Sequence, residues 1–155
     1  MPTNPELDRT DVRLLEAVQR DARQTLAQLA HHCASSPSSV ARRLQRLEQL
    51  GVVTGYAANV SAHGLGYVQD VLVEVTLRGQ DGNSMSAFEE VIGTVQQVLE
   101  CWLMSGEFDY LLRVVTRDAA DYENVHRKLS QLPGVWRLRS SFAMRQVLQR
   151  PIQVP

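Results

Sequence analysis

The sequence predicts an α+β protein, with an N-terminal, winged-helix-like helix-turn-helix domain and a C-terminal ferredoxin-like βαββαβ domain. In the first third of the chain, apolar residues recur at helical spacing beside three helix-capping signals. Beyond Gly66, short segments of alternating apolar residues are interrupted by two amphipathic segments, in the order β-α-β-β-α-β. We therefore expect a helix-turn-helix domain over residues 1–53, a linker strand and hinge over 54–66, and the ferredoxin-like domain over 67–155.

The composition is that of a folded protein with one or two small domains. The 155 residues are 44% hydrophobic and have a formal net charge of -1, which permits real cores and argues against disorder. Two cysteines cannot form a disulfide framework, and the sequence shows no secretion signal. Its apolar runs fall short of the roughly 18 residues that cross a bilayer. We expect a cytoplasmic protein with no membrane partner.

Two helices are expected before residue 33. The stretch LDRTDVRLLEAVQRDA, residues 7–22, has apolar residues at helical spacing and Asp8 as its N-cap. In the next stretch, TLAQLAHH, Thr25 and Gln28 have the spacing of a capping box. The segment CASS then gives a short turn before a third helix. Two helices joined by three or four residues are typical of a helix-turn-helix.

The third helix, SSPSSVARRLQRLEQLG, is the predicted DNA-contacting element. Ser36 is its N-cap, Pro37 is its first residue, and Gly51 ends it at a positive φ. One side is apolar and faces a core, with Val40, Leu44, Leu47 and Leu50. The other side is polar and basic, which suits a helix in the major groove with phosphate at its N-terminus. The predicted DNA-binding residues are Ser36, Ser38, Ser39, Arg42, Arg43, Gln45 and Arg46.

Positive charge in the N-terminal third is concentrated on this helix. Through Val60 the chain has seven arginines and six acidic residues, but the three arginines of the third helix meet only Glu48 within it. Such local clustering binds phosphate even in a slightly acidic protein. Which arginine reads a base and which binds a phosphate stays open.

The second domain is predicted from segments in βαββαβ order. Strands are expected in VLVEVTLR, VLECWLMSG, YLLRVVTR and VWRLRSSFAMRQV, and helices in NSMSAFEEVIGT and DAADYENVHRKLSQL, the latter capped by Asp118. We expect Cys101 in the core and Trp136 on the same strand face as Leu138. The two helices cover one sheet face, and apolar residues on the other face predict packing against a second subunit.

The segment GEFD between two of these strands is predicted to be a tight turn. Gly106 would adopt a positive φ, and Asp109 would cap the turn through its side chain.

Three motifs occur in order along the chain: LDRTDVRLLEAVQRDAR, SPSSVARRLQRLEQLGVVTGYAANV, and SGEFDYLL at residues 105–112. With them, the sequence from about residue 7 to 147 resembles the Lrp/AsnC, or feast/famine, family of bacterial and archaeal transcription regulators. The resemblance implies binding to double-stranded DNA, homodimers that assemble into octamers, and an amino-acid effector bound between subunits, with no required cofactor. Family members often have a glycine in the turn where this chain has Ala34, so we expect a slightly altered turn.

The resemblance also implies an effector pocket around SGEFDYLL. Gly106 would let the ligand backbone approach closely, and Asp109 would pair with an α-ammonium group or orient the amides that bind the carboxylate. Members often have a larger residue at the position of Ser141, which leaves the pocket size open. The predicted effector-binding residues are Met104, Gly106, Glu107, Phe108, Asp109, Tyr110, Thr116, Ser140, Ser141 and Phe142.

Metal and catalytic sites are not expected. His31, His32 and Cys33 are consecutive helical residues and cannot converge on one ion. Glu123 and His126 have di-iron spacing but lack further ligands. Without a catalytic motif we expect no enzyme. Two alternatives stay open: an effector-independent DNA-architectural protein, and an amino-acid-handling enzyme or sensor whose N-terminal helices only dimerise.

Overall fold

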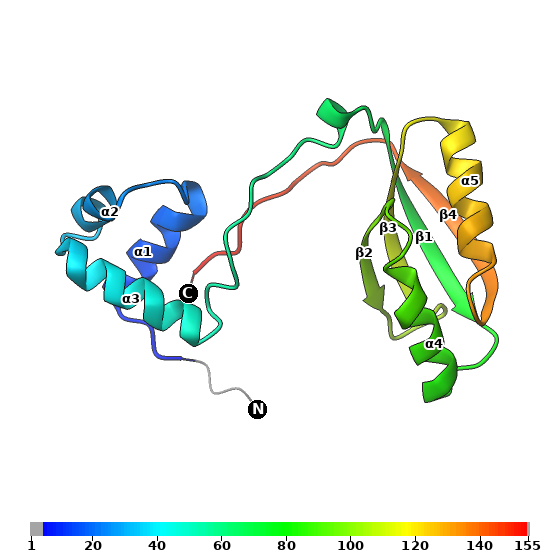
Figure 1. Cartoon of the computed structure of the whole chain (residues 1–155), viewed down its shortest axis with the longest axis horizontal. Helices are drawn as coiled ribbons and strands as arrows, with labels where there is room; N and C mark the ends of the chain where they lie inside the picture. The colour runs from blue at the N-terminus through cyan, green and yellow to red at the C-terminus, as the bar shows by residue number, and fades with distance from the viewer. Residues whose placement is uncertain (1–4, 155) are drawn as a thin grey trace. The chain divides into compact units, whose positions relative to one another are not determined.

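A computed structural model describes residues 5–154, and the chain divides into two compact units (Figure 1). The second unit is Val60–Val147, and the first contains the chain before it together with the tail after it. Residues 148–154 thus belong to the helical unit, where Val154 packs against the core. The sequence-based boundary had placed this tail in the second domain. No helix of the described residues is long and apolar enough to span a membrane.

The first unit consists of three helices, α1 (Arg9–Arg20), α2 (Leu26–His32) and α3 (Pro37–Gln49) (Figure 1). The linker strand expected within residues 54–66 is absent, because no residue of this segment is part of a strand. Leu50, expected in the core, is the C-cap of α3 and half exposed. The buried core of the unit comprises Leu14, Leu15, Ala17, Leu29, Ala30, Cys33, Val40 and Leu47.

The three helix caps predicted in this unit are confirmed. The Asp8 side chain accepts hydrogen bonds from the first-turn amides of α1 and forms a capping box with Asp11. Thr25 and Gln28 form the same motif at α2, and Ser36 accepts from the first turn of α3. Each cap satisfies amides that have no partner within the helix, so the three helix starts are set locally.

The turn between α2 and α3 keeps the left-handed residue that a glycine would favour. Ala34 has a φ of 48°, and within the described residues it is the one non-glycine with positive φ. The Ser35 N–H closes the end of α2 by donating to the Ala30 carbonyl at 2.9 Å. Alanine therefore occupies this turn at a cost of about 1 kcal/mol relative to glycine. At the other end of α3, Gly51 has the predicted positive φ, 69°.

The second unit is a four-stranded antiparallel sheet with two helices on one face (Figure 1). Its elements are a short 3-10 helix, η1 (His63–Leu65), then β1 (Gln69–Leu77), α4 (Gly82–Ile92), β2 (Val98–Leu103), β3 (Tyr110–Thr116), α5 (Ala119–Ser130) and β4 (Val135–Ala143). The strand order β2-β3-β1-β4 is the ferredoxin-like arrangement predicted from the βαββαβ order.

Alternate residues of β1 and β3 form the core beneath α4 and α5. The rings of Phe88 from α4 and Tyr110 from β3 lie 4.6 Å apart at the centre of this layer. Val125 from α5 is also fully buried against the sheet. Asp118 caps α5 as predicted by accepting from the Asp121 N–H at 2.8 Å.

Two expectations about the sheet are wrong. Cys101 is exposed rather than buried, because β2 is the edge strand and its neighbours Leu99 and Leu103 are exposed as well. Trp136 does not share the core-facing side of β4, because a register shift against β1 inserts an extra residue at this point. The shift brings Val135 against the core and leaves Trp136 exposed.

Candidate functional site

The N-terminal end of α3 offers polar groups to an anion. The Ser36 Oγ accepts from the Ser39 N–H at 3.3 Å and lies 3.2 Å from the Ser38 Oγ. Ser36 and Ser38 are both exposed, and Ser39 is half-buried. Free amides and hydroxyl groups at a helix N-terminus are the usual ligands of a backbone phosphate.

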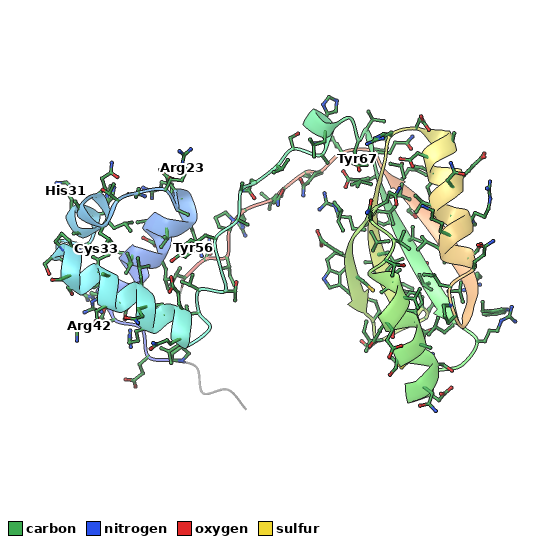
Figure 2. All side chains as sticks on the ribbon, in the orientation of Figure 1. Arg23, His31, Cys33, Arg42, Tyr56 and Tyr67 are labelled. Atoms are coloured by element: carbon green, nitrogen blue, oxygen red, sulfur yellow. The ribbon has the colours of Figure 1, made fainter. Side chains whose placement is uncertain are left out.

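Arg42 and Gln45 lie on the exposed side of α3 (Figure 2). Within residues 5–154, Arg42 has no carboxylate within ion-pair distance. Its guanidinium is therefore available to a phosphate or to a guanine edge, and the Gln45 amide has the donor and acceptor needed to read adenine.

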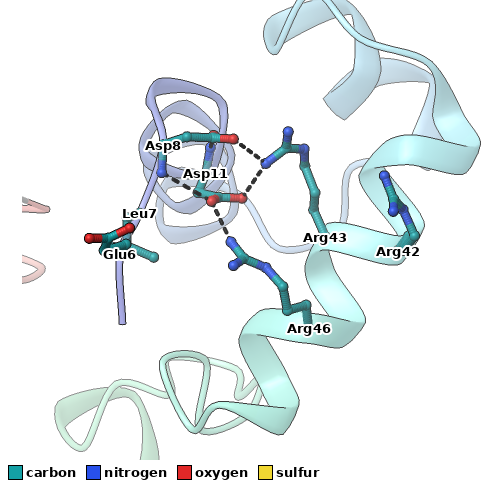
Figure 3. A pocket seen from close by; sticks show the side chains of 7 residues that line it. All are labelled: Glu6, Leu7, Asp8, Asp11, Arg42, Arg43 and Arg46. Carbon is teal, nitrogen blue, oxygen red and sulfur yellow. Dashed lines mark hydrogen bonds and ion pairs between the residues drawn. The ribbon is translucent and has the colours of Figure 1, made fainter. Parts of the chain in front are cut away.

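The other two arginines of α3 are held by carboxylates from the start of α1 (Figure 3). The Arg43 Nη1 donates to Asp8 Oδ2 at 2.7 Å and to Asp11 Oδ1 at 2.8 Å. The Arg46 Nη2 donates to Asp11 Oδ2. We call these four residues the Asp11 cluster. It joins α1 to α3 and lines a surface cavity of about 380 Å³, together with Glu6, Leu7 and Arg42.

Asp11 is the buried centre of this cluster and was missed by the sequence-based reasoning. Its side chain is 1% exposed, against 24% for Arg43 and 45% for Arg46. A signal was present in the sequence, since Asp11 lies three and four residues before Leu14 and Leu15, on the buried side of α1. A carboxylate on an apolar stripe indicates a partner of opposite charge from another element.

Contacts within the cluster shift the pKa values of Asp8 and Arg43 toward their charged forms. The Asp11 backbone N–H lowers the pKa of Asp8 below its ordinary value of 3.8, and the Arg43 guanidinium lowers it further. The hydrogen bonds that Arg43 donates to the carboxylates, to Asp11 first and to Asp8 second, raise the pKa of Arg43. Both shifts favour the charged forms of Asp8 and Arg43, which form an ion pair.

We expect the Asp8→Asn variant to be less stable than wild type at pH 7 and to lose this difference in acid. Because the pKa of Asp8 is lower in the folded chain, its charge stabilises folding above about pH 3.8, and this contribution disappears as the pH falls through the lowered pKa. Asparagine remains a good N-cap, so the comparison isolates the charge. Urea denaturation between pH 7 and pH 3 measures the difference, with the exposed Glu16→Gln variant as the control. A difference that is constant across this range would contradict the expectation.

Asp109, predicted to cap its own turn, instead joins the turn to β1. Its carboxylate accepts from the Leu77 N–H and from the Gln80 Nε2, each at 2.7 Å, and the residue is 6% exposed. Gly106 does not have the predicted positive φ. The turn is closed by the Met104 N–H, which donates to the Asp109 carbonyl at 2.8 Å. This backbone hydrogen bond and the buried Asp109 carboxylate therefore fix the conformation of the turn that contains Glu107 and Phe108.

The remaining predicted effector residues are spread along the sheet. Tyr110 is buried, and its hydroxyl donates to Glu89 at 2.7 Å; burial first, and then this hydrogen bond, raise the pKa of the phenol. Thr116 lies at the far end of β3, where it donates to Gln69 at 3.0 Å. In β4, Ser140 and Phe142 pair with core-facing residues of β1, whereas Ser141 lies on the opposite face.

One chain therefore does not bring the ten predicted effector residues into one pocket. Met104 to Tyr110 gather at one end of β3 and Thr116 stands at the other end. The two ends of β3 are six residue steps apart, which is about 20 Å. Phe142 is on the Thr116 side, where its ring lies 4.9 Å from that of Tyr122.

Metal binding finds no support among residues 5–154, where no group of three or more His, Cys, Asp or Glu side chains could hold an ion. The rings of His31 and His32 are 6.2 Å apart and edge-to-face. Cys33 is buried in the helical core.

The chain has a helix-turn-helix formed by α2 and α3, with one side of α3 exposed, followed by a ferredoxin-like unit. This combination is typical of DNA-binding regulators with a separate ligand-binding domain. Comparison with known families agrees with both halves. Residues 7–54 match the family described as winged helix-turn-helix DNA-binding. Residues 70–153 match the Lrp/AsnC ligand binding domain. The chain belongs to the Lrp/AsnC family of transcription regulators.

Relatives match the chain over nearly its whole length. It is 37% identical to the Bkd operon transcriptional regulator of Pseudomonas aeruginosa, over 94% of this chain and 95% of that protein. It is 33% identical to the leucine-responsive regulatory protein of Escherichia coli K12, over 93% of this chain and 88% of the relative. A transcriptional regulator from Neisseria meningitidis, solved as an L-Met complex, has a TM-score of 0.88 at 30% identity, over 97% of both chains.

Proposed function

We propose that this regulator binds double-stranded DNA through α3 and that a free amino acid, bound between subunits, changes its assembly or its DNA affinity. The observation that carries the DNA half is the exposed side of α3, with a Ser36 cap and with Arg42, which has no ion-pair partner among residues 5–154. A DNA partner and an amino-acid ligand both support a cytoplasmic location as part of this proposal.

An amino-acid effector is supported by the match to the ligand-binding domain and by the relatives. One relative is named leucine-responsive, and another was solved with L-Met. The separation of the predicted pocket residues along β3 supports a pocket that more than one chain completes. Asp109 has both carboxylate oxygens occupied, which favours its role in orienting the turn over direct pairing with the ligand's ammonium group.

The helix-free face of the sheet is the surface that we propose for homodimer formation. Leu72 and Trp102 are 39% and 43% exposed on it. Beside them, Arg113 pairs with Asp70 and Glu100, each at 2.9 Å. An apolar face whose charged side chains are paired within the chain suits packing against an identical copy. The family resemblance extends this dimer to an octamer, and two-fold symmetry would let paired α3 helices bind half-sites about one helical turn apart.

Thermal denaturation in the presence of each of the twenty amino acids tests the effector half of the proposal. A ligand that binds only the folded assembly stabilises it by about 2.7 kcal/mol at a hundredfold excess over its Kd. We expect at least one amino acid to raise the melting temperature and to change the sedimentation coefficient or the affinity for duplex DNA.

The outcomes separate the two halves of the proposal. If none of the twenty shifts the melting temperature while the protein still binds duplex DNA, the effector half is wrong and the DNA-architectural alternative holds. If the protein shows no salt-dependent binding to duplex DNA, the DNA half is wrong.

A further inference from the structure

We infer that Asp11, assisted by Asp8, holds two of the three arginines of α3 away from DNA and thereby limits non-specific binding. The inference rests on the proposed DNA-binding function and deepens it by assigning separate roles to the three arginines. Arg42 contacts DNA, whereas Arg43 and Arg46 are neutralised within the protein.

The contacts of Asp11 leave its carboxylate nearly saturated. Oδ1 accepts from Arg43 at 2.8 Å, and Oδ2 accepts from Arg46 and from the Asp8 backbone N–H at 3.2 Å. A carboxylate has about four acceptor positions, so three are used by α1 and α3 alone. Because the side chain is 1% exposed in the paired state, losing an arginine contact costs more here than at an exposed carboxylate.

Arg43 is the more tightly held of the two paired arginines. One nitrogen, Nη1, bridges both carboxylates, and the Arg43 Nε is buried with no hydrogen-bond partner among the residues that the structure describes. Turning this side chain toward a phosphate would break two charge-assisted bonds to form one or two in their place. Arg46 is more exposed, but its departure would also leave Asp11 with less compensation.

The charges around the cavity sum to zero. Glu6, Asp8 and Asp11 face Arg42, Arg43 and Arg46 across it. Non-specific DNA binding is driven by counterion release, and its affinity falls with salt by a log–log slope of about 0.9 per phosphate contacted. Three free arginines on α3 would strengthen binding to DNA of any sequence. With one free arginine beside Gln45, contacts to bases contribute a larger share of the binding free energy.

The test measures binding to a random-sequence duplex of about 30 base pairs across a fourfold range of salt. We expect Arg42→Ala to lower the salt slope by about one, and Arg43→Ala and Arg46→Ala to leave it unchanged. We expect Asp11→Asn to raise the slope by one to two. For each arginine released, the affinity should fall by a further factor of roughly 3.5 over the fourfold range of salt. The ratio of affinities for a site selected by the wild-type protein and for random DNA should then fall.

Glu16→Gln is the matched control, because it removes one exposed negative charge from α1 without releasing an arginine. Its salt slope should equal that of wild type. If Asp11→Asn fails to fold, Asp8→Asn supplies a second test, since asparagine keeps the cap and frees Arg43 from one carboxylate. Arg43→Ala should then remove the added slope of Asp8→Asn. In Asp11→Asn it should remove only the part that Arg43 contributes, because Arg46 is also released.

Three results would overturn the inference. The first is a salt slope that Arg43→Ala or Arg46→Ala lowers as much as Arg42→Ala does. The second is an Asp11→Asn slope equal to that of Glu16→Gln, and the third is a selectivity ratio that the aspartate variants leave unchanged. A wild-type protein that does not bind the duplex at all would overturn the proposed function as well, which distinguishes the two failures.

Discussion

Arg43→Ala is expected to lower the free energy of unfolding of the helical unit by about 3 kcal/mol, because two charge-assisted hydrogen bonds are lost together. Arg43 bonds to Asp8 and Asp11 from one nitrogen, and Asp11 is 1% exposed. Removing the guanidinium leaves a buried carboxylate with Arg46 as its remaining charged partner.

Hydrogen exchange measured by mass spectrometry provides the readout, because peptides from α1 and α3 report this unit separately from the sheet. The matched control is Arg42→Ala on the same helix. Its side chain is exposed and makes no ion pair within the described chain, so its effect should stay within about 0.5 kcal/mol. Equal exchange in the two variants would show that the Arg43 contacts contribute nothing to stability.

The parts of the fold that could be predicted from sequence are those determined by neighbouring residues. Asp8, Ser36 and Asp118 lie directly before their helices, and each bonds to amides at most three residues away. The strand order follows similarly from the alternation of elements, because few arrangements of βαββαβ bury one face of every strand. Short-range capping and periodicity therefore carry most of the fold.

The features that were missed depend on residues far apart in the chain. The bond from Arg43 to Asp11 spans 32 positions, and so does the bond from Leu77 to Asp109. Helical spacing placed Arg43 near the exposed face of α3 but could not show that α1 brings a carboxylate there. Likewise, the exposure of Cys101 depends on β2 being the edge strand, which alternation within β2 does not reveal.

For the effector site, sequence identified the important turn but not the way in which its residues act. From the sequence, Asp109 could cap the turn, pair with an α-ammonium group or orient the amides that bind the ligand's carboxylate. Of these, pairing with the ligand needs an accessible carboxylate. In the structure, the carboxylate is buried and bonded to the end of β1 and to Gln80. The same residue can therefore control ligand binding through the conformation of the turn without touching the ligand.

Comparing Asp109→Ala with Asp109→Asn separates these two roles. Alanine leaves the buried Leu77 N–H and the Gln80 amide without partners, so we expect a loss of about 2–3 kcal/mol in the stability of the sheet unit. Asparagine can still accept from Leu77, and the Gln80 amide can turn to present its oxygen, so most of this stability should remain.

Amino-acid affinity, measured by calorimetry with the effector found in the thermal screen, then decides how Asp109 acts. If the residue orients the turn, Asp109→Asn keeps most of the affinity and Asp109→Ala loses it. If its negative charge pairs with the ligand's ammonium group, Asp109→Asn loses affinity at least tenfold while its stability is retained, because a charged partner has been removed from the site. Since both oxygens already accept from protein donors, we expect the first result. The second would mean that ligand binding displaces Gln80 and exposes the carboxylate.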